Sequence, residues 1–169
     1  MPMSIVNITT VNSDALNLKT FMDKVLQKIV DTYAEYNVPL PGRQFWTMGE
    51  PAIDCEQLCV SFVQMYLGLP GDEASQPQRC TVPRTAVLTV FLSRQIPVVG
   101  SNGKAPSAEK IQEGSEIAAV DAWMFMELIN KLDQWEPGEF GMGVIATAEA
   151  ATAEGGFQTM RMQISMVVP

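Results

Sequence analysis

QLCVSFVQMYL (residues 57–67) and RTAVLTVFLSRQI (residues 84–96) decide the fold, because both stretches have the composition of long β-strands. The second alternates apolar with polar residues, which predicts a strand with one buried face. The first is apolar at both parities and predicts a strand covered on both sides. One parity of the first stretch carries Leu58, Val60, Phe62 and Tyr66.

Between these strands lies GLPGDEASQPQRCTVP (residues 68–83), which is far longer than the usual hairpin loop of about 2 to 5 residues. Long connections in compact domains are usually functional. We therefore expect a long first hairpin in which residues 69–83 project toward a partner. The candidate contact residues in this loop are Leu69, Asp72, Glu73, Gln76 and Arg79.

The segment before the hairpin predicts a helix over residues 14–36, with Asn12 or Ser13 as its N-cap. Its core-facing residues recur at alternating three- and four-residue steps, which places them on one helical face. They are Leu18, Phe21, Val25, Ile29, Thr32 and Tyr36. The prolines of NVPLPG end this helix. We expect residues 43–54 to be a connection into the first long strand, and residues 1–12 to form an extended N-terminal arm.

A second helix is predicted from Ser107, as N-cap, to about Trp135. At about 100° per residue one face gathers the expected core residues Ile111, Ala118, Ala122, Phe125, Ile129 and Leu132. The acidic residues Glu109, Glu113, Glu116 and Glu127 then point outward. Val120, Trp123 and Met124 lie among them. An apolar group with a tryptophan on an acidic face indicates a contact surface, although isolated exposed apolar residues are common.

The C-terminal region predicts two more strands, over residues 142–149 and 157–168, with EGG as the turn between them. The last strand has the clearest two-residue period of the chain, in Met160, Met162, Ile164, Met166 and Val168. The order of elements is helix, strand, strand, helix, strand, strand. We therefore expect a single α+β domain over residues 1–169, with two long helices packed on one face of an antiparallel sheet.

Bulk composition argues against several classes of function. The formal charge of −8 repels phosphate backbones, so we do not expect sequence-reading nucleic-acid binding. The N-terminus has no signal-peptide pattern, and no apolar run approaches the roughly 18 residues that span a bilayer, so we expect a soluble, unexported protein. None of the 169 residues is histidine, which removes much of the usual acid–base, triad and metal chemistry.

Three cysteines and one pair of carboxylates are the remaining candidates for chemistry. An odd number of cysteines without an export signal fits reduced thiols. On a strand Cys55 and Cys59 would lie about 13 Å apart, too far to share a metal or a disulfide. In a loop they could converge with Cys80 and Asp54 on zinc, but a fourth ligand is doubtful without histidine. Asp54 and Glu56 fit a solvated strand end better than a catalytic pair. We predict no catalytic residue, no metal site and no cofactor.

The order of elements resembles tail terminator proteins of long-tailed phages that infect actinobacteria. The resemblance is carried by the block WTMGEPAIDCEQLCVSFVQMYLGLPGDEASQPQRC, by the long strand after it, and by SAEKIQEGSEIAAVDAWMF. It runs from about Asn17 to the C-terminus. Tail terminators are small α+β proteins that form a hexameric ring on the last ring of the tail tube, stop its polymerisation, and present a surface to the head-side connector.

The resemblance implies a virion structural protein of the tail or neck, assembled in the host cytoplasm and without enzymatic activity. The implied partners are further copies of the chain in a homohexamer, the tail tube protein, and a head-side connector or stopper protein. Genomic DNA would pass through the ring without specific binding, and no membrane would be involved.

In a closed ring one patch meets a different patch on the neighbour. Residues 69–83 and the group Val120, Trp123 and Met124 are the candidate patches. From Glu109 to Glu139, eight acidic residues stand against Lys110 and Lys131, a local balance of −6. An acidic inner wall would let DNA pass without adhering, so we name Glu109, Glu113, Glu116 and Glu127 as candidate lumen-facing residues.

Three alternatives stay open. Another neck protein, such as a head-tail connector or a head-completion ring, shares the size and the assembly behaviour of a terminator. An enzyme would use Cys59 or the pair Asp54 and Glu56. An adaptor would bind a protein partner through residues 69–83.

Overall fold

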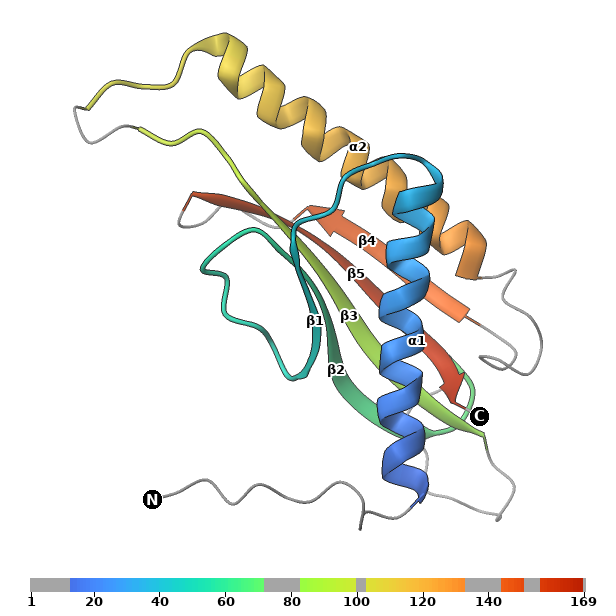
Figure 1. The fold of residues 1–169 in the computed structure, drawn as a ribbon. Helices are drawn as coiled ribbons and strands as arrows, with labels where there is room; N and C mark the ends of the chain where they lie inside the picture. Colours follow the sequence, from blue (N-terminus) through green and yellow to red (C-terminus); the bar gives the residue numbers. More distant parts are fainter. Residues whose placement is uncertain (1–12, 72–82, 100–102, 133–143, 151–155, 169) are drawn as a thin grey trace, which may run out of the picture.

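The structure, a computed structural model, describes residues 13–71, 83–99, 103–132, 144–150 and 156–168. In chain order the elements are α1 (Ser13–Glu35), β1 (Arg43–Met48), β2 (Gln57–Leu67), β3 (Arg84–Gln95), α2 (Ala108–Leu132), β4 (Val144–Ala150) and β5 (Phe157–Val168). Both helices lie on the same side of the sheet (Figure 1). The predicted α+β class is confirmed.

The strands form one sheet in the order β1-β2-β3-β5-β4. Three of the neighbouring pairs are antiparallel, namely β2–β3, β3–β5 and β5–β4, but β1 runs parallel to β2. The sheet is therefore mixed, and the prediction of a purely antiparallel sheet is wrong at this edge. Residues 43–48, expected to be part of a connection, form the additional strand β1.

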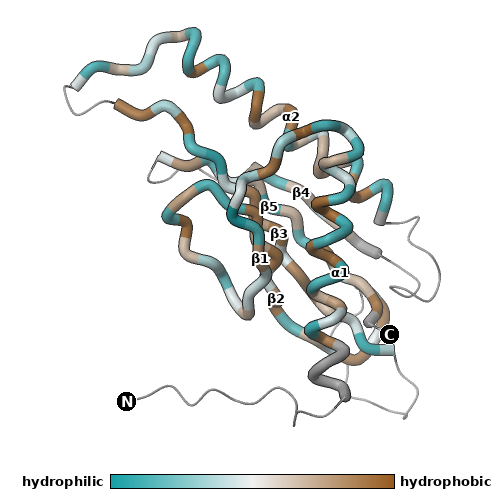
Figure 2. Tube along the Cα trace, viewed as in Figure 1, coloured by the Kyte–Doolittle hydropathy of each residue, from teal (hydrophilic) through white to brown (hydrophobic). Residues whose placement is uncertain are grey.

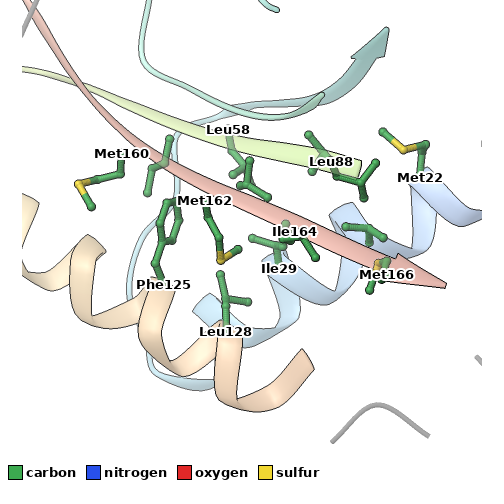
Figure 3. Close-up of a cluster of buried hydrophobic side chains, with 14 of the residues drawn as sticks. Met22, Ile29, Leu58, Leu88, Phe125, Leu128, Met160, Met162, Ile164 and Met166 are labelled. Atoms are coloured by element: carbon green, nitrogen blue, oxygen red, sulfur yellow. The ribbon is translucent and has the colours of Figure 1, made fainter. Parts of the chain in front are cut away.

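The hydrophobic core fills the space between the sheet and the two helices (Figure 3). α1 packs over β1 and β2, whereas α2 packs over β4 and β5. Strand register aligns the core residues in layers, with Leu58 opposite Leu92 and Leu88 opposite Ile164. The period predicted for β5 is confirmed where its side chains are described, because Met160, Met162, Ile164 and Met166 are all buried. The other buried members of the core are Phe21, Met22, Val25, Ile29, Tyr33, Val60, Ala86, Val90, Met124, Phe125 and Leu128.

A short crossover, residues 49–56, joins the parallel strands β1 and β2. Such crossovers usually need a dozen or more residues and commonly contain a helix. The Ser61 hydroxyl donates to the Gly49 carbonyl over 2.7 Å, and the Gln57 side-chain amide donates to the Ala52 carbonyl over 2.8 Å. Gln57 and Ser61 have the parity opposite to the core residues of β2, so the crossover covers the sheet face away from the helices.

The long first hairpin is confirmed as a pairing of β2 with β3, but it contains an irregularity between Phe62 and Gln64. Beyond this point Met65 lies opposite the core residue Ala86, and Tyr66 lies opposite Thr85. Tyr66 therefore faces away from the helices, and the prediction that it shares the face of Leu58 is wrong. One extra residue in a strand reverses the parity of everything after it.

Helix α1 follows its predicted face with one exception. Phe21, Val25, Ile29 and Thr32 are buried and Leu18 is half-buried, but Tyr36 is exposed. Tyr36 lies just beyond the last helical residue, and its ring turns toward α2. Met22 and Tyr33, which were not in the predicted set, are fully buried. The sheet and α2 together cover more of the surface of α1 than the single predicted face.

Helix α2 is rotated relative to the prediction. Its buried residues are Asp121, Met124, Phe125 and Leu128, which are spaced as neighbours on one helical face. At about 100° per residue this face is turned by roughly 70° from the predicted one. Ile111, expected in the core, is exposed, and Met124, expected in the contact surface, is in the core. The side chain of Leu132 is not among those that the structure describes. Because Asp121 is charged, a hydropathy pattern does not count it among the core residues, so the buried face of α2 cannot be recognised from that pattern.

Candidate interaction surface

The residues considered for covalent chemistry are engaged in the fold. Cys59 is fully buried on β2, and burial raises the pKa of its thiol to about 12, so the thiolate is scarce at neutral pH. Asp54 is ion-paired with Arg43 over 2.7 Å, and a hydrogen bond from Cys55 together with the Arg43 charge lowers the pKa of Asp54. Glu56 accepts a hydrogen bond from the Gln95 backbone amide over 3.0 Å.

The two carboxylates thus have different partners and do not form a pair. Cys55 precedes β2 rather than lying on a strand, and Cys80 lies outside the described residues. In the described part of the chain, no three or more Cys, Asp or Glu side chains gather into a group that could hold a metal ion.

The outward face of α2 combines acidic and apolar side chains. Glu109, Glu113 and Glu116 are exposed, as predicted, and Ile117 and Val120 are exposed among them. These five residues lie within roughly 100° of one another around the helix axis. We call them the outer stripe of α2. Whether the glutamates face a ring lumen stays a prediction.

The sheet leaves most side chains in the N-terminal half of α2 uncovered. From residue 108 to residue 120, Gly114 and Ala118 are half-buried and the other side chains are exposed. In Figure 1 this half of α2 extends past the end of the strands. The segment 96–99 accompanies it, because a Cβ added at Gly114 would lie 3.3 Å from Pro97 Cδ. We call residues 96–99 and 108–120 together the α2 projection.

The α2 projection displays apolar side chains to solvent. Val98, Val99 and Ile111 are exposed in addition to the apolar members of the outer stripe, and Figure 2 shows brown positions along both segments. Ile117 lies at the edge of the outer stripe next to the buried stripe of α2, and it lines a hollow together with Leu92 of β3 and Met160 of β5. An isolated helix of this length is only marginally stable in water. Within the described residues, little of this chain supports the projection.

An ion pair anchors α2 at the point where the projection begins. The Arg94 guanidinium donates to both carboxylate oxygens of Asp121, over 2.7 and 2.8 Å, and to the Pro39 carbonyl over 2.8 Å. The Asp121 side chain is 1% exposed and that of Arg94 is 16% exposed. The hydrogen bonds with Asp121 raise the pKa of Arg94, and burial raises the pKa of nearby Tyr33. The Arg94 side chain therefore fixes α2 to β3 and to the segment that follows α1.

Aromatic rings join the two helices beside the outer stripe. Tyr36 and Trp123 make a T-shaped contact with ring centroids 5.1 Å apart. The Tyr36 hydroxyl donates to Glu127 over 3.1 Å, and this hydrogen bond raises the pKa of Tyr36. Lys131 lies over the Tyr36 ring and pairs with Glu35. Trp123 remains 49% exposed, so it serves both as a clamp between the helices and as part of the surface.

The predicted site residues therefore have different outcomes. Val120 and Trp123 are exposed, whereas Met124 is buried. Glu127 is half-buried and bonded to Tyr36, so it is less free than the other three glutamates. In the hairpin loop Leu69 is exposed. The remaining loop candidates Asp72, Glu73, Gln76 and Arg79 lie outside the described residues.

The sheet face away from the helices carries a polar hollow of about 230 Å³ beyond the crossover. The Arg161 guanidinium lies over the Phe91 ring at 5.3 Å, and its buried Nε has no hydrogen-bond partner among the residues that the structure describes. The other lining residues are Glu50, Thr89, Thr147, Glu149 and Gln163. Antiparallel strands commonly leave one such polar face to solvent.

Comparison with known proteins gives no family assignment. A scan against protein-family models finds no match, and a search of curated proteins finds no relative. Of the helices in the described residues, none is both long and apolar enough to cross a bilayer.

Proposed function

We propose that this chain is a virion structural protein, a tail terminator that forms a ring on the tail tube, stops its polymerisation and joins it to the head-side connector. The observation that carries the proposal is the exposed apolar surface of α2, formed by Ile117, Val120 and Trp123. A cluster of exposed apolar side chains marks an interaction site more often than a solvated surface. Tryptophan is also the residue type most enriched at the energetic centre of interfaces.

The state of the reactive side chains supports this proposal over an enzyme. Cys59 is buried with a raised pKa, and the carboxylates of Asp54 and Glu56 are engaged by Arg43 and a backbone amide. Cys59 therefore lacks access to a substrate, and the two exposed carboxylates are held by different partners and do not converge as a general acid and base would.

The sheet edges support assembly of identical copies. β1 and β4 are the two edge strands of the described sheet. Edge strands present unpaired backbone groups that tend to pair with other chains unless they are protected. A ring in which each copy covers its neighbour is one arrangement that protects them.

Tail length in a phage lacking the gene tests the proposal. Loss of a terminator should give overlong tails, and supplying the wild-type chain should restore one defined length. Val120→Asp, which places a charge in the exposed apolar surface, should fail to restore that length. Ser115→Asp should restore it, because Ser115 is also exposed but points about 140° away from Val120 around α2 and does not neighbour Trp123.

Tails of normal length on detached, DNA-filled heads would instead identify a head-side connector. If Val120→Asp restored the normal tail length fully, the exposed apolar surface of α2 would not be the contact that the proposal needs.

A further inference from the structure

We propose that residues 4–11 of one copy add a β-strand to the sheet of a second copy, beside residues 63–67 of β2. This inference deepens the proposed function, on which it rests, by naming two surfaces that meet between copies. The observations that carry it are an unpaired length of β2, the exposed apolar side chains around it, and the sequence of residues 4–11.

β2 has a strand on both sides over only part of its length. β3 pairs with β2 along residues 57–67, whereas β1 pairs with it along residues 57–62 alone. Met48, the last residue of β1, lies opposite Phe62. In the part of the sheet that the structure describes, residues 63–67 therefore have a neighbouring strand on the β3 side only. We call residues 63–67 the β2 step, which is about 16 Å long at about 3.3 Å per residue.

The crossover between β1 and β2 does not cover the β2 step. The Gly49 amide donates to the Phe62 carbonyl over 3.1 Å. From there the crossover turns back, because the Ala52 carbonyl accepts a hydrogen bond from Gln57 at the start of β2. Among the described residues, none supplies a backbone partner to the β1 side of the step. Backbone groups at such an edge tend to pair with another chain.

The sequence of the β2 step lacks the residues that usually protect a sheet edge. Residues 63–67, VQMYL, contain no charged residue and no proline, both of which commonly protect edge strands. Val63 and Met65 are exposed, and so is Met48 at the end of β1. A strand added here would therefore gain apolar contacts as well as backbone hydrogen bonds.

The N-terminal residues have the composition of a strand that could pair with this edge. Residues 1–12, expected to form an extended N-terminal arm, lie outside the described residues. Within them, residues 4–11, SIVNITTV, contain six β-branched residues and neither charge nor proline. β-Branched residues are enriched in strands. Val6 and Ile8 share one parity, so in a strand both would face the same side of the sheet.

The arm begins at the end of the molecule where the β2 step lies. α1 packs over β2, and in Figure 1 the first turns of α1 and the end of β2 are both at the lower end. Met65 belongs to the layer of Ala86 and Met166, and Figure 3 shows Met166 at the end of the core where Met22 of α1 lies. A fully extended arm of this length reaches about 40 Å. The arm of one copy is therefore long enough to reach the step of a neighbour.

We assign the arm to a second copy because the proposed ring needs a contact between two different patches. Each copy would give its arm to one neighbour and receive the arm of the other. Exchange of an identical segment is a low-cost route to assembly. Strand addition supplies affinity through main-chain hydrogen bonds and specificity through alternate side chains. An arm that fills the step of its own chain is the competing arrangement.

Thiol cross-linking separates the two arrangements. In a Cys55→Ser/Cys80→Ser background, Ile8→Cys/Met65→Cys places one accessible thiol in the arm and one in the step, while Cys59 stays buried. Treatment with a short bismaleimide should give a ladder of covalently joined chains on a denaturing gel. The matched control replaces Met65→Cys by Ile53→Cys. Ile53 has the same exposed fraction, 39%, but lies in the crossover, so the control should lose the ladder.

Sedimentation velocity tests whether the arm drives association. Asn7→Pro/Ile8→Pro removes two successive N–H groups, and these point to opposite sides of a strand, so one of them would face β2. Self-association should be weaker than that of wild type by at least about tenfold. Met3→Pro is the matched control, because it also gives two neighbouring prolines, with Pro2, but lies outside residues 4–11. It should associate like wild type, with circular dichroism confirming that both variants are folded.

A monomer with an internal cross-link, or a ladder no stronger than that of the control, would overturn the inference. So would a wild-type chain that stays monomeric at the highest concentration reached, or a double-proline variant that associates like wild type. Failure of the inference is distinguishable from failure of the proposed function. If the ladder is absent but the wild-type chain still sets tail length, only the strand exchange is wrong. If the ladder forms but a phage lacking the gene keeps its normal tail length, the exchange stands and the terminator proposal fails.

Discussion

Asp121→Asn tests the anchor of α2 most sharply. In the folded protein the Asp121 carboxylate accepts two hydrogen bonds from Arg94 and is 1% exposed. Asparagine has nearly the same shape but carries no charge, so the Arg94 guanidinium would keep its position and lose its counter-charge. The stability of the fold should fall because a mostly buried cation is left uncompensated.

The size of the loss follows from the burial of the pair. Removing one partner of a buried ion pair costs about 3 to 5 kcal/mol. Arg94 is 16% exposed and retains its bond to the Pro39 carbonyl, so we expect the lower end, about 3 kcal/mol. For a chain of this size that corresponds to a fall in Tm of about 6 to 12 °C. Asp54→Asn is the matched control, because the Arg43–Asp54 pair is 49% and 67% exposed, and an exposed ion pair should contribute far less to stability than the buried one.

Urea unfolding followed by circular dichroism, at protein concentrations low enough to prevent association, gives both free energies. Arg94→Met/Asp121→Leu should be more stable than Asp121→Asn, because removing both charges leaves none unpaired. A loss for Asp121→Asn no larger than that for Asp54→Asn would refute the reasoning. It would mean that the ion pair does not hold α2 to the sheet.

Three further results are expected. Iodoacetamide at pH 8 should modify Cys55 in the folded protein but Cys59 only in urea, because Cys59 is buried and its pKa of about 12 keeps the thiol protonated. Equal labelling of the two cysteines in the folded protein, measured by peptide mass spectrometry, would contradict this. Gly114→Ala should raise the free energy of unfolding by about 0.5 kcal/mol, since alanine favours the helix by about 1 kcal/mol and close contact with the half-buried Pro97 offsets part of it. A destabilised variant would show that Pro97 cannot move aside. Trp123→Ala should lower the free energy of unfolding by about 1 kcal/mol because it removes the contact with Tyr36, and Trp123→Phe should lower it less. Equal urea midpoints for wild type and Trp123→Ala would show that this contact does not hold the helices together.

Local periodicity was sufficient to predict most elements of the fold. β5 repeats every second residue from Met160 to Met166, so this strand and its buried face follow from the sequence. The alternation of β3 also predicted a strand, but the expectation of a single buried face is wrong, because Thr85, Val87, Phe91 and Ser93 on its other face are buried too. β1 did not follow, because its six residues show no period of their own. The strand is held by contacts that a sequence does not display: register with β2, and a hydrogen bond of 2.7 Å from the Trp46 indole to Asp23 on α1.

The candidate surface was predictable only in part, and the errors have two causes. The face of α2 was assigned from hydropathy, which counted Ile111 as core and Met124 as surface. In the structure Asp121 lies in the buried stripe because Arg94 neutralises it, and the helix turns accordingly. The exposure of Ile111 has a second reason, since α2 continues beyond the sheet that would have covered it. No pattern within the helix could reveal where the sheet ends.

Electron microscopy of the purified protein incubated with purified tail tubes tests the central claim most directly, namely that identical copies assemble to cap a tube. The account predicts a ring at one end of each tube, and tubes that no longer lengthen when tube protein is added. Bare tube ends that continue to grow, or binding to portal-bearing heads alone, would contradict it.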